Sequence, residues 1–465
     1  MSEKIEAVKA ALSGIRMDDR SNVLKRNSRD FYWYSPVLKR QLDKVEAELV
    51  VFPTSEEEVI RVLAACYEND VPVTGRGGGT GNYGQAMPLS GGVVMSLVEL
   101  NAIKEIAPGR VVVEPGARLI DIDDACREHS GQELRTLPST FRHATIGGFV
   151  GGGSGGVGSI NWGGLREFGN ILRLRVVTME AEPRVLELTG MDIQKANHAY
   201  GTTGIITELE MPLAPSYDWA EVIVGFDGFM ASTEYANGLA RQDGILTKLV
   251  TAIAAPIPEQ YFTPFRSYIP EGKSIVVLLV APHAMDAFQT YNKAARGEVL
   301  FNSGRGDKVP GNMPVIELTW NHTTLQALKV DKTITYLQVL YPYPDHMEKA
   351  RFMYEHFGDE VPMHLEFVRF NGDITCSGLP LVRYTTEERL DKIIEFHENH
   401  DCLIANPHRY TLEEGGMKNT DKVQLDFKKE VDPKGLLNPG KMIAWDNPDF
   451  DFQSKRVYIF PGLEE

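Results

Sequence analysis

The sequence predicts an α+β protein with more than one domain. The chain has 465 residues, a length at which two or three domains are expected. Short strands alternate with helices as far as residue 215, and longer apolar strands follow, as in an antiparallel sheet covered by helices. We therefore expect an N-terminal domain of α/β character at 1–215, an α+β domain at 216–400 and a C-terminal segment at 401–465.

The first domain begins with a helical lead-in over residues 1–30. Segments 49–53 and 71–74 are short strands. Between them, Ser55 and the glutamates after it give an N-cap and an acidic first turn to a helix at 59–69. Farther on we expect strands at 92–97, 110–116 and 204–211, a helix at 118–129, and a hairpin formed by 171–179 and 184–188.

The second domain alternates apolar strands with helical stretches. Its clearest helix lies at 386–399. Strands without intervening parallel crossovers are typical of an antiparallel sheet in an α+β fold. The strands are expected at 220–226, 274–280, 333–340 and 362–370.

Composition excludes several classes of function. The chain carries 64 acidic against 48 basic residues, a net charge of −16, which argues against a nucleic-acid-binding face. Its 4 cysteines form no CxxC pair, so a thiolate zinc site is not expected and a reducing compartment is favoured. The N-terminus lacks a signal-peptide apolar region, and the longest apolar run, 275–281, is too short to span a bilayer. We expect a cytoplasmic protein without a membrane span.

The stretch VTGRGGGTGNYGQAMP, residues 73–88, is called the first glycine segment here. It holds six glycines directly after a predicted strand, and exposed backbone N–H groups in such a loop form a cradle for an anion. The Lys-Ser/Thr ending of an ATP-binding Walker loop is missing, and the helix that follows the glycines of a dinucleotide-binding loop is also missing. A phosphate or pyrophosphate is therefore the expected ligand, in a fold that is neither the ATP-binding nor the dinucleotide-binding one.

A second glycine segment, residues 145–164, reads TIGGFVGGGSGGVGSINWGG. It contains GxGxxG at Gly151, Gly153 and Gly156, but the residues that follow are too rich in glycine for the long helix of a dinucleotide fold. Two such segments in one domain suggest one elongated ligand that has a pyrophosphate and a long flat body.

An ordered set of motifs resembles a known family. VPVTGRGGGTG, GQAMP, VEPGARL, LPST, ATIGG, WGG, GTTGIITELEM and DPKGLLNPGK follow one another as in the FAD-binding oxidoreductases of the vanillyl-alcohol oxidase superfamily, which include glycolate-oxidase-type and D-lactate-dehydrogenase-type flavoproteins. The resemblance covers residues 50–215 and 403–443. It implies a PCMH-type FAD-binding domain of two α/β subdomains, a substrate-binding cap domain with an antiparallel sheet, and a tail that returns to the first domain.

The resemblance also implies which residues contact FAD. The first glycine segment would bind the pyrophosphate, later stretches would run beside the flavin ring, and the tail motif would return toward the cofactor. In chain order these residues are Gly75, Arg76, Gly77, Gly78, Gly79, Thr80, Gly81, Asn82, Gln85, Ala86, Met87, Pro138, Ser139, Thr140, Thr145, Gly147, Gly148, Ser154, Gly155, Ser159, Ile206, Asn438 and Lys441.

Many members of this superfamily attach FAD through a histidine in the pyrophosphate loop, sometimes with a cysteine in the second region. Here Thr80, Gly81 and Asn82 stand in that loop, and residues 145–170 contain no cysteine. We therefore expect non-covalent FAD.

The catalytic candidates are histidines and their neighbours. His408 in NPHRY lies where glycolate-oxidase-type relatives carry Glu-His-Gly near the flavin, so His408 is our first choice for the base, with Arg409 and Tyr410 as substrate contacts. The alternative is a turn that caps the tail. His322 in ELTWNHTT is a further candidate, although a lone histidine at such a place more often makes a structural hydrogen bond.

The substrate is less well defined. Hydroxyacid dehydrogenases of the superfamily carry an HxGDGNLH-like metal-binding segment, and here FNGDI matches only its middle, so we expect no resident metal. His364 and Glu366 share a strand face and could bind a metal only together with another histidine. An alcohol, including an aromatic one that Trp320, Tyr336, Tyr341 and Tyr343 would line, is as well supported as a 2-hydroxy acid.

The leading hypothesis is an FAD-dependent oxidase or dehydrogenase that transfers hydride from a CH–OH group to flavin. One alternative is a flavoprotein that oxidises a C–N bond in an amine or N-heterocycle, and another is a nucleotide-binding module without catalysis. The sequence leaves open whether oxygen or a carrier accepts the electrons and whether the chain forms a homo-oligomer.

Overall fold

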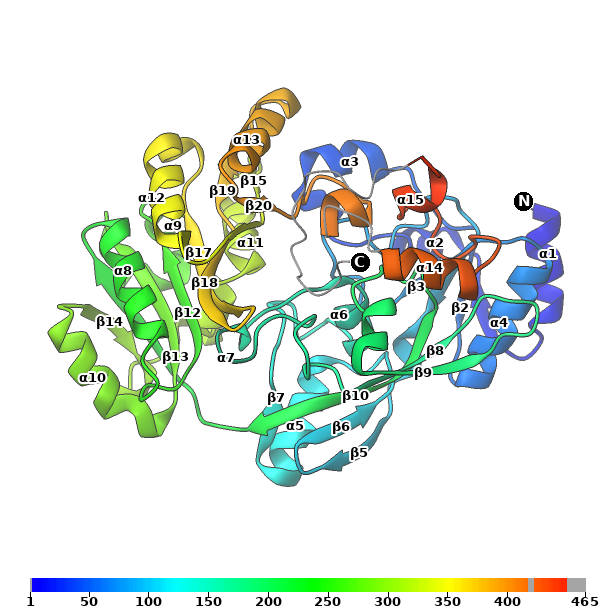
Figure 1. Cartoon of the computed structure of the whole chain (residues 1–465), viewed down its shortest axis with the longest axis horizontal. Helices are drawn as coiled ribbons and strands as arrows, with labels where there is room; N and C mark the ends of the chain where they lie inside the picture. The colour runs from blue at the N-terminus through cyan, green and yellow to red at the C-terminus, as the bar shows by residue number, and fades with distance from the viewer. Residues whose placement is uncertain (1, 417–421, 450–465) are drawn as a thin grey trace.

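A computed structural model describes residues 2–416 and 422–449 of the chain. Helices alternate along it with sheets that are mainly antiparallel, so the chain is α+β as predicted. In Figure 1 the segments from the two ends of the chain lie in one lobe, and the middle of the chain forms the other. Within the described residues, no helix combines the length and apolar character needed to cross a bilayer.

The first sheet has four strands in the order β1 (Arg16–Asp18), β2 (Leu49–Phe52), β4 (Val93–Ser96) and β3 (Val73–Arg76). β4 lies parallel to both β2 and β3, and β1 is antiparallel. Helices α1 (Ser2–Ala11) and α4 (Glu56–Glu68) pack on it through one apolar cluster. The predicted N-cap of α4 is confirmed, because Ser55 Oγ accepts a hydrogen bond from Glu58 N at 3.2 Å.

The second sheet is antiparallel, in the order β5 (Ile103–Ala107), β6 (Arg110–Val113), β10 (Ile205–Pro215), β8 (Arg173–Val177) and β9 (Val185–Thr189), with β7 (Gln132–Leu134) paired to the end of β10. The predicted hairpin, which is β8–β9, is confirmed. Helix α5 (Leu119–Ser130), also predicted, packs against this sheet.

The second glycine segment contains a helix that its sequence did not predict. α6 (Ile146–Gly152) has the sequence IGGFVGG, and its four glycines, which have low helix propensity, argue against a helix there. Thr145 caps it, because its Oγ1 accepts from Gly148 N at 3.4 Å, and the apolar residues Ile146, Phe149 and Val150 are buried. Burial and capping therefore outweigh the low helix propensity of glycine. The segment continues into α7 (Ser159–Trp162), which has four residues, too short for a dinucleotide fold.

The third sheet has eight antiparallel strands in the order β14, β11, β13, β12, β17, β18, β16 and β20. Their bounds are β14 (Glu298–Asn302), β11 (Ala220–Phe226), β13 (Ser274–Val280), β12 (Thr247–Ile253), β17 (His364–Phe370), β18 (Asp373–Gly378), β16 (Val339–Tyr341) and β20 (Leu403–Ile404). The predicted strand at 333–340 is divided in two, because β15 (Ile334–Tyr336) pairs with β19 (Leu381–Arg383) in a separate small sheet.

The two faces of the eight-stranded sheet have different roles. One face packs on α8 (Phe229–Ala240), α10 (Met285–Ala294), α12 (His346–Phe357) and α13 (Glu387–Asn399) around the largest apolar core. On the other face, strands β14, β11, β13 and β12, one half of the sheet, pack on α9 (Ile257–Tyr261) and α11 (Asn321–Val330). The other half, strands β17, β18, β16 and β20, lies toward the first lobe, where the glycine segments lie (Figure 1).

The tail of the chain returns to the first sheet. Val73 N donates to Leu436 O and Asn438 N to Val73 O, each at 2.8 Å. The preceding helix α14 (Lys422–Val431) carries a buried ion pair, in which Lys428 Nζ lies 2.7 Å from Asp432 Oδ2 with side-chain exposures of 2% and 0%. Asp432 also accepts from the backbone N–H groups of Leu436 and Leu437. This carboxylate therefore fixes the turn that starts the tail motif.

We expect Asp432→Ala to destabilise the protein by about 3–5 kcal/mol, because it leaves the buried Lys428 ammonium without its counter-ion. Asp426→Ala is the matched control on the same helix, because its ion pair with Lys422 is exposed and worth at most about 1 kcal/mol. Urea unfolding of both variants measures the difference. Equal stability of the two variants would contradict the assignment.

Candidate active site

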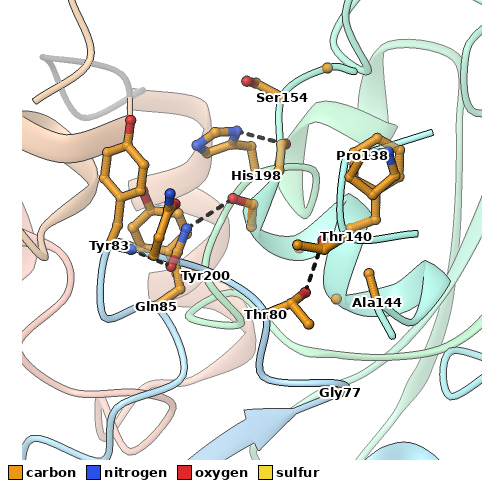
Figure 2. A pocket seen from close by; sticks show the side chains of 18 of the residues that line it. Gly77, Thr80, Tyr83, Gln85, Pro138, Thr140, Ala144, Ser154, His198 and Tyr200 are labelled. Atoms are coloured by element: carbon orange, nitrogen blue, oxygen red, sulfur yellow. Dashed lines mark hydrogen bonds between the residues drawn. The ribbon is translucent and has the colours of Figure 1, made fainter. Parts of the chain in front are cut away.

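A cavity of about 320 Å³ lies between the two lobes. Its walls come from the first glycine segment, the second glycine segment and strands β17, β18, β16 and β20 of the eight-stranded sheet. Figure 2 shows the two glycine segments facing each other, with Gly77, Thr80 and Gln85 on one and Ser154 on the other. Thr140 Oγ1 donates to Thr80 Oγ1 at 3.3 Å, which joins the first segment to the loop before the second.

The structure brings together nearly all of the residues that the sequence assigned to the cofactor. The cavity is lined by Gly75, Arg76, Gly77, Gly78, Gly79, Thr80, Gly81, Asn82, Gln85, Ala86, Pro138, Ser139, Thr140, Thr145, Gly147, Gly148, Ser154, Gly155, Ser159 and Ile206. The remaining three, Met87, Asn438 and Lys441, do not line it.

These three residues support the first glycine segment from behind. Asn438 Nδ2 donates to Gln85 O at 2.8 Å and to Tyr200 O at 2.7 Å. Lys441 Nζ donates to Gly84 O at 2.5 Å, and Met87 is fully buried in an apolar cluster. The tail motif therefore fixes the backbone of the cavity wall rather than forming its surface.

Glycine is required where the two segments meet. A Cβ on Gly78 would lie 2.3 Å from the backbone oxygen of His143, and one on Gly77 would lie 2.1 Å from Thr145 Oγ1. A Cβ on Gly151, in the last turn of α6, would meet no atom within 4 Å, although Gly151 lines the cavity. The first two glycines therefore permit packing between segments, whereas Gly151 leaves space for a ligand.

Two side chains that line the cavity, Gln85 and His198, are held in place by hydrogen bonds to the backbone of the second glycine segment. Gln85 Nε2 donates to Gly152 O at 3.1 Å, and its Oε1 accepts from Tyr83 N at 2.9 Å (Figure 2). His198 Nδ1 lies 2.9 Å from Gly153 O, and burial lowers the pKa of His198 to about 3, so the ring is neutral and Nδ1–H is the donor. Both contacts fix the turn after α6.

The charges beside the first glycine segment are buried. Asp30 lines the cavity and accepts from Tyr32 N at 2.9 Å and from Ala86 N at 3.3 Å. Burial raises the pKa of the Asp30 carboxyl, and burial lowers the pKa of the nearby Arg76 and Lys441. Asp30 was missed in the sequence because it lies in the lead-in, and the aromatic run FYWY after it was the one available signal.

The second lobe contributes an apolar surface, mostly from the eight-stranded sheet, that the sequence did not identify as a set. We call it the cap wall, and it consists of Trp320, Leu340, Val368, Phe370 and Leu379, all of which line the cavity. Of these five residues, Trp320 alone was expected from the sequence to line the substrate pocket. Strand residues at a cavity carry no local motif, and only the sheet register shows that they share a face.

The four residues predicted for catalysis do not line the cavity. His408 is 2% exposed, and its ring nitrogens lie 2.8 Å from Ser35 Oγ and 2.9 Å from Tyr336 O. Burial lowers the pKa of His408 to about 3. His408 therefore connects the lead-in, the tail and the small sheet.

The other candidates also have partners elsewhere. Arg409 lies 3.7 Å from Asp391 and 3.8 Å from Glu387, and Tyr410 packs beside Lys441, whose Nζ is 5.1 Å from the ring centre. His322 Nδ1 lies 2.6 Å from a carboxylate oxygen of Glu317.

Apart from Trp320, the residues considered for a metal site and for an aromatic pocket lie away from the cavity surface. His364 Nε2 lies 2.8 Å from Glu366 Oε1, and among the described residues no group of three or more His, Cys, Asp or Glu side chains is arranged to hold a metal ion. Tyr336 and Tyr341 are fully buried in apolar cores, and Tyr343 is half exposed. The expected tyrosine lining is therefore wrong, because packing buries Tyr336 and Tyr341 in the cores and Tyr343 is on the surface outside the cavity.

Comparison with solved structures shows the fold of the whole chain. A crystal structure of alkyldihydroxyacetonephosphate synthase matches 95% of this chain and 85% of its own chain, with a TM-score of 0.70 and 16% sequence identity. A second crystal form of that protein matches equally well, with a TM-score of 0.70. At 16% sequence identity, this similarity shows a shared fold.

Sequence relatives match the glycine-rich part of the chain. An uncharacterised FAD-linked oxidoreductase of Mycobacterium tuberculosis is 32% identical over 206 residues, which are 40% of this chain and 43% of that protein. The glycolate oxidase subunit GlcD of Escherichia coli is 32% identical over 205 residues, 41% of this chain and 40% of that protein. A D-lactate dehydrogenase of Anaerostipes hadrus is 30% identical over 184 residues, covering 37% and 38%. The match thus spans less than half the length of these relatives.

The model of the FAD binding domain family matches residues 47–187. That range contains both glycine segments, whose main chains meet around the cavity, and Gly151, beside which the cavity is open. Backbone N–H groups without side chains are suited to a diphosphate, and an open slot beside glycine is suited to a flat ring, so the residues present fit FAD. The match of residues 47–187 to the FAD binding domain family and the fit of the residues around the cavity both identify FAD as the cofactor.

Proposed function

We propose that the chain is an FAD-dependent oxidoreductase that oxidises a CH–OH group, with 2-hydroxy acids as the substrate class. The observation that carries the proposal is the single cavity in which both glycine segments face an apolar wall from another domain. Flavin enzymes need this combination, because the cofactor and the substrate must share one enclosed space. The names of two relatives, a glycolate oxidase subunit and a D-lactate dehydrogenase, support hydroxy acids over aromatic alcohols and over C–N substrates.

The roles of the lining residues follow from their chemistry. We propose that backbone N–H groups of Gly77, Gly78 and Gly79 bind the pyrophosphate and that the second glycine segment lies along the flavin ring. FAD is held without a covalent bond, because the loop has no histidine and residues 145–170 have no cysteine. Bound FAD supplies the two-electron acceptor.

The chain's own residues shape the space in which the substrate lies. Gln85 and His198 fix the turn after α6, and the cap wall excludes water from the opposite side. We propose that His408 is a positioning residue, since both of its ring nitrogens already have partners in a buried site. The cytoplasmic location, homo-oligomer formation and the division into domains at residues 215 and 400 stay predictions.

The purified protein is expected to show flavin absorption bands near roughly 370 and 450 nm and to release the flavin on acid precipitation. Under anaerobic conditions, 2-hydroxy acids should bleach the longer-wavelength band, while benzylic alcohols and amines should not. Absence of flavin from protein supplied with FAD would contradict the cofactor assignment. Bleaching of the flavin by amines alone would contradict oxidation of a CH–OH group and would favour oxidation of a C–N bond.

Gly151→Ala should weaken FAD binding at least about tenfold and leave the thermal stability of flavin-stripped protein unchanged, because the added methyl group meets only cavity space. Gly78→Ala should lower that stability, since its methyl group would lie 2.3 Å from a backbone oxygen. Gly244→Ala, at a site with no atom within 4 Å, is the neutral control. FAD titration by fluorescence quenching and thermal unfolding measure the two effects. Unchanged FAD affinity in Gly151→Ala would count against ring placement there.

His408→Gln should reduce the loss of stability at acid pH. The folded-state pKa of His408, about 3, lies below the ordinary value near 6.5, so the unfolded chain binds a proton that the folded chain does not. Stability from this group is full above about pH 6.5 and is lost as pH falls toward 3. Between pH 7 and 5 the wild type should therefore lose about 2 kcal/mol more than the variant.

The exposed His129→Gln is the control for this titration and should keep the wild-type pH dependence. Urea unfolding at the two pH values measures the slopes. FAD-loaded His408→Gln should also retain flavin reduction within a few fold, and a loss of several orders of magnitude would restore His408 as a base.

A further inference from the structure

Most of the cap wall comes from one face of the eight-stranded sheet. Leu340 and Glu366 are both paired with Ser377, and Val368 is paired with Thr375. Side chains of paired and alternate residues share a face, so Leu340, Val368 and Phe370 point to the same side, the one that lines the cavity. The opposite set of residues on these strands is buried in the core beneath the helices.

Most of the side chains that this part of the cavity presents to its contents are apolar, and Ser377 and Gln338 are polar lining residues beside them. In the described part of the sheet that lines it, the charged residue is Arg369, which lies between Val368 and Phe370 on β17. Alternation directs Arg369 to the other face, and its Nη1 donates to Gly372 O at 2.8 Å in the following turn. An apolar substituent of a substrate therefore fits against this wall better than a charged one.

Trp320 completes the wall in an unusual backbone conformation. Its φ is 51° and its ψ is −144°, a combination that residues with a Cβ rarely adopt. Non-glycine residues in such regions persist when surrounding contacts determine them, and they cluster at functional sites. The conformation places Trp320 immediately before α11 and on the cavity surface.

A buried carboxylate holds Trp320 in this conformation. Trp320 N donates to Glu366 Oε1 at 2.5 Å, His364 Nε2 lies 2.8 Å from the same oxygen, and Thr251 Oγ1 donates to Oε2. His364 and Glu366 are 0% and 1% exposed. Loss of the Trp320 N–H would leave Glu366 Oε1 with His364 as its one remaining partner in a buried site, so this hydrogen bond favours the observed conformation of Trp320.

The Trp320 ring extends from the wall to the second glycine segment. A Cβ on Gly155 would lie 3.7 Å from the Cη2 atom of Trp320, which is van der Waals contact. Gly155 and Trp320 both line the cavity. The ring therefore stands where the segment assigned to the flavin meets the apolar wall.

We propose that Trp320 is a specificity-determining residue that, with the cap wall, selects 2-hydroxy acids carrying an apolar side chain, and that Glu366 positions it. The inference rests on the proposed oxidation of 2-hydroxy acids. Each methylene of the substrate that contacts the wall should improve binding about fourfold, as expected for the burial of one CH₂ group. Glycolate, which has no side chain, would be a poor substrate.

The first test measures binding without turnover. Octanoate and acetate, which cannot be oxidised at a hydroxyl group, are titrated into the FAD-loaded protein, and the perturbation of the flavin spectrum gives their dissociation constants. Octanoate should bind at least tenfold more tightly than acetate. Equal affinities would overturn the proposal.

The second test measures anaerobic flavin reduction by glycolate, 2-hydroxybutanoate and 2-hydroxyoctanoate. The ratio of the rate constant to the dissociation constant should rise with chain length. Trp320→Ala should reduce the preference for 2-hydroxyoctanoate at least tenfold, and Trp320→Phe, which keeps a ring, should retain most of it. Trp162→Ala is the control, because Trp162 is 38% exposed and does not line the cavity.

Glu366 is tested by two substitutions. Glu366→Ala removes the acceptor of the Trp320 N–H and should lower the chain-length preference as Trp320→Ala does, whereas Glu366→Gln keeps a carbonyl oxygen and should restore it. A structural role alone would lower stability without changing the preference among substrates. A Glu366→Ala variant that folds, binds FAD and keeps the wild-type preference would overturn the positioning role.

The outcomes separate the two proposals. If no 2-hydroxy acid reduces the flavin, the proposed function fails, and the octanoate and acetate titrations still decide the role of the wall. If glycolate and 2-hydroxyoctanoate reduce the flavin equally and Trp320→Ala changes neither, the proposed function stands and the specificity inference fails.

Discussion

The close approach of two glycine-containing stretches is the constraint on which the rest of the structure depends. At Gly77 and Gly78 the first glycine segment lies so near Thr145 and the backbone oxygen of His143 that no β-carbon fits. The contact brings the end of a parallel strand beside α6, which belongs to the layer of the second sheet. Two separately built layers thereby share one surface composed mainly of backbone, which is the surface a diphosphate requires.

Segments from both ends of the chain maintain that contact. Asp30 in the lead-in accepts a hydrogen bond from Ala86, and Asn438 in the tail donates to Gln85 and Tyr200. These partners act from behind the glycine segment, so the face toward the cavity stays free of side chains. A loop so rich in glycine has little conformational preference of its own, and the buried polar contacts supply the order that it lacks.

The second lobe contributes a different physical character to the same cavity. Its sheet carries a packed core on one face and the cap wall on the other, so the cavity combines a polar backbone cradle with an apolar surface. The buried Glu366 carboxylate joins strand β17 to Trp320 at the junction of the two lobes. Trp320 N, His364 Nε2 and Thr251 Oγ1 all lie within hydrogen-bond distance of this carboxyl group, and together these contacts fix the shape of the wall.

Local patterns in the sequence determined the glycine segments, most strands and the helix cap at Ser55, because backbone conformation and capping depend on residues within a few positions. They did not determine which histidine meets the cavity. His408 contacts Ser35, 373 residues away, and Tyr336, 72 residues away, and these contacts place it in the interior. Asp30 and the cap wall likewise became visible only in the tertiary structure. Whether a side chain faces a ligand depends on sheet register and on packing between distant segments, neither of which leaves a local pattern in the chain.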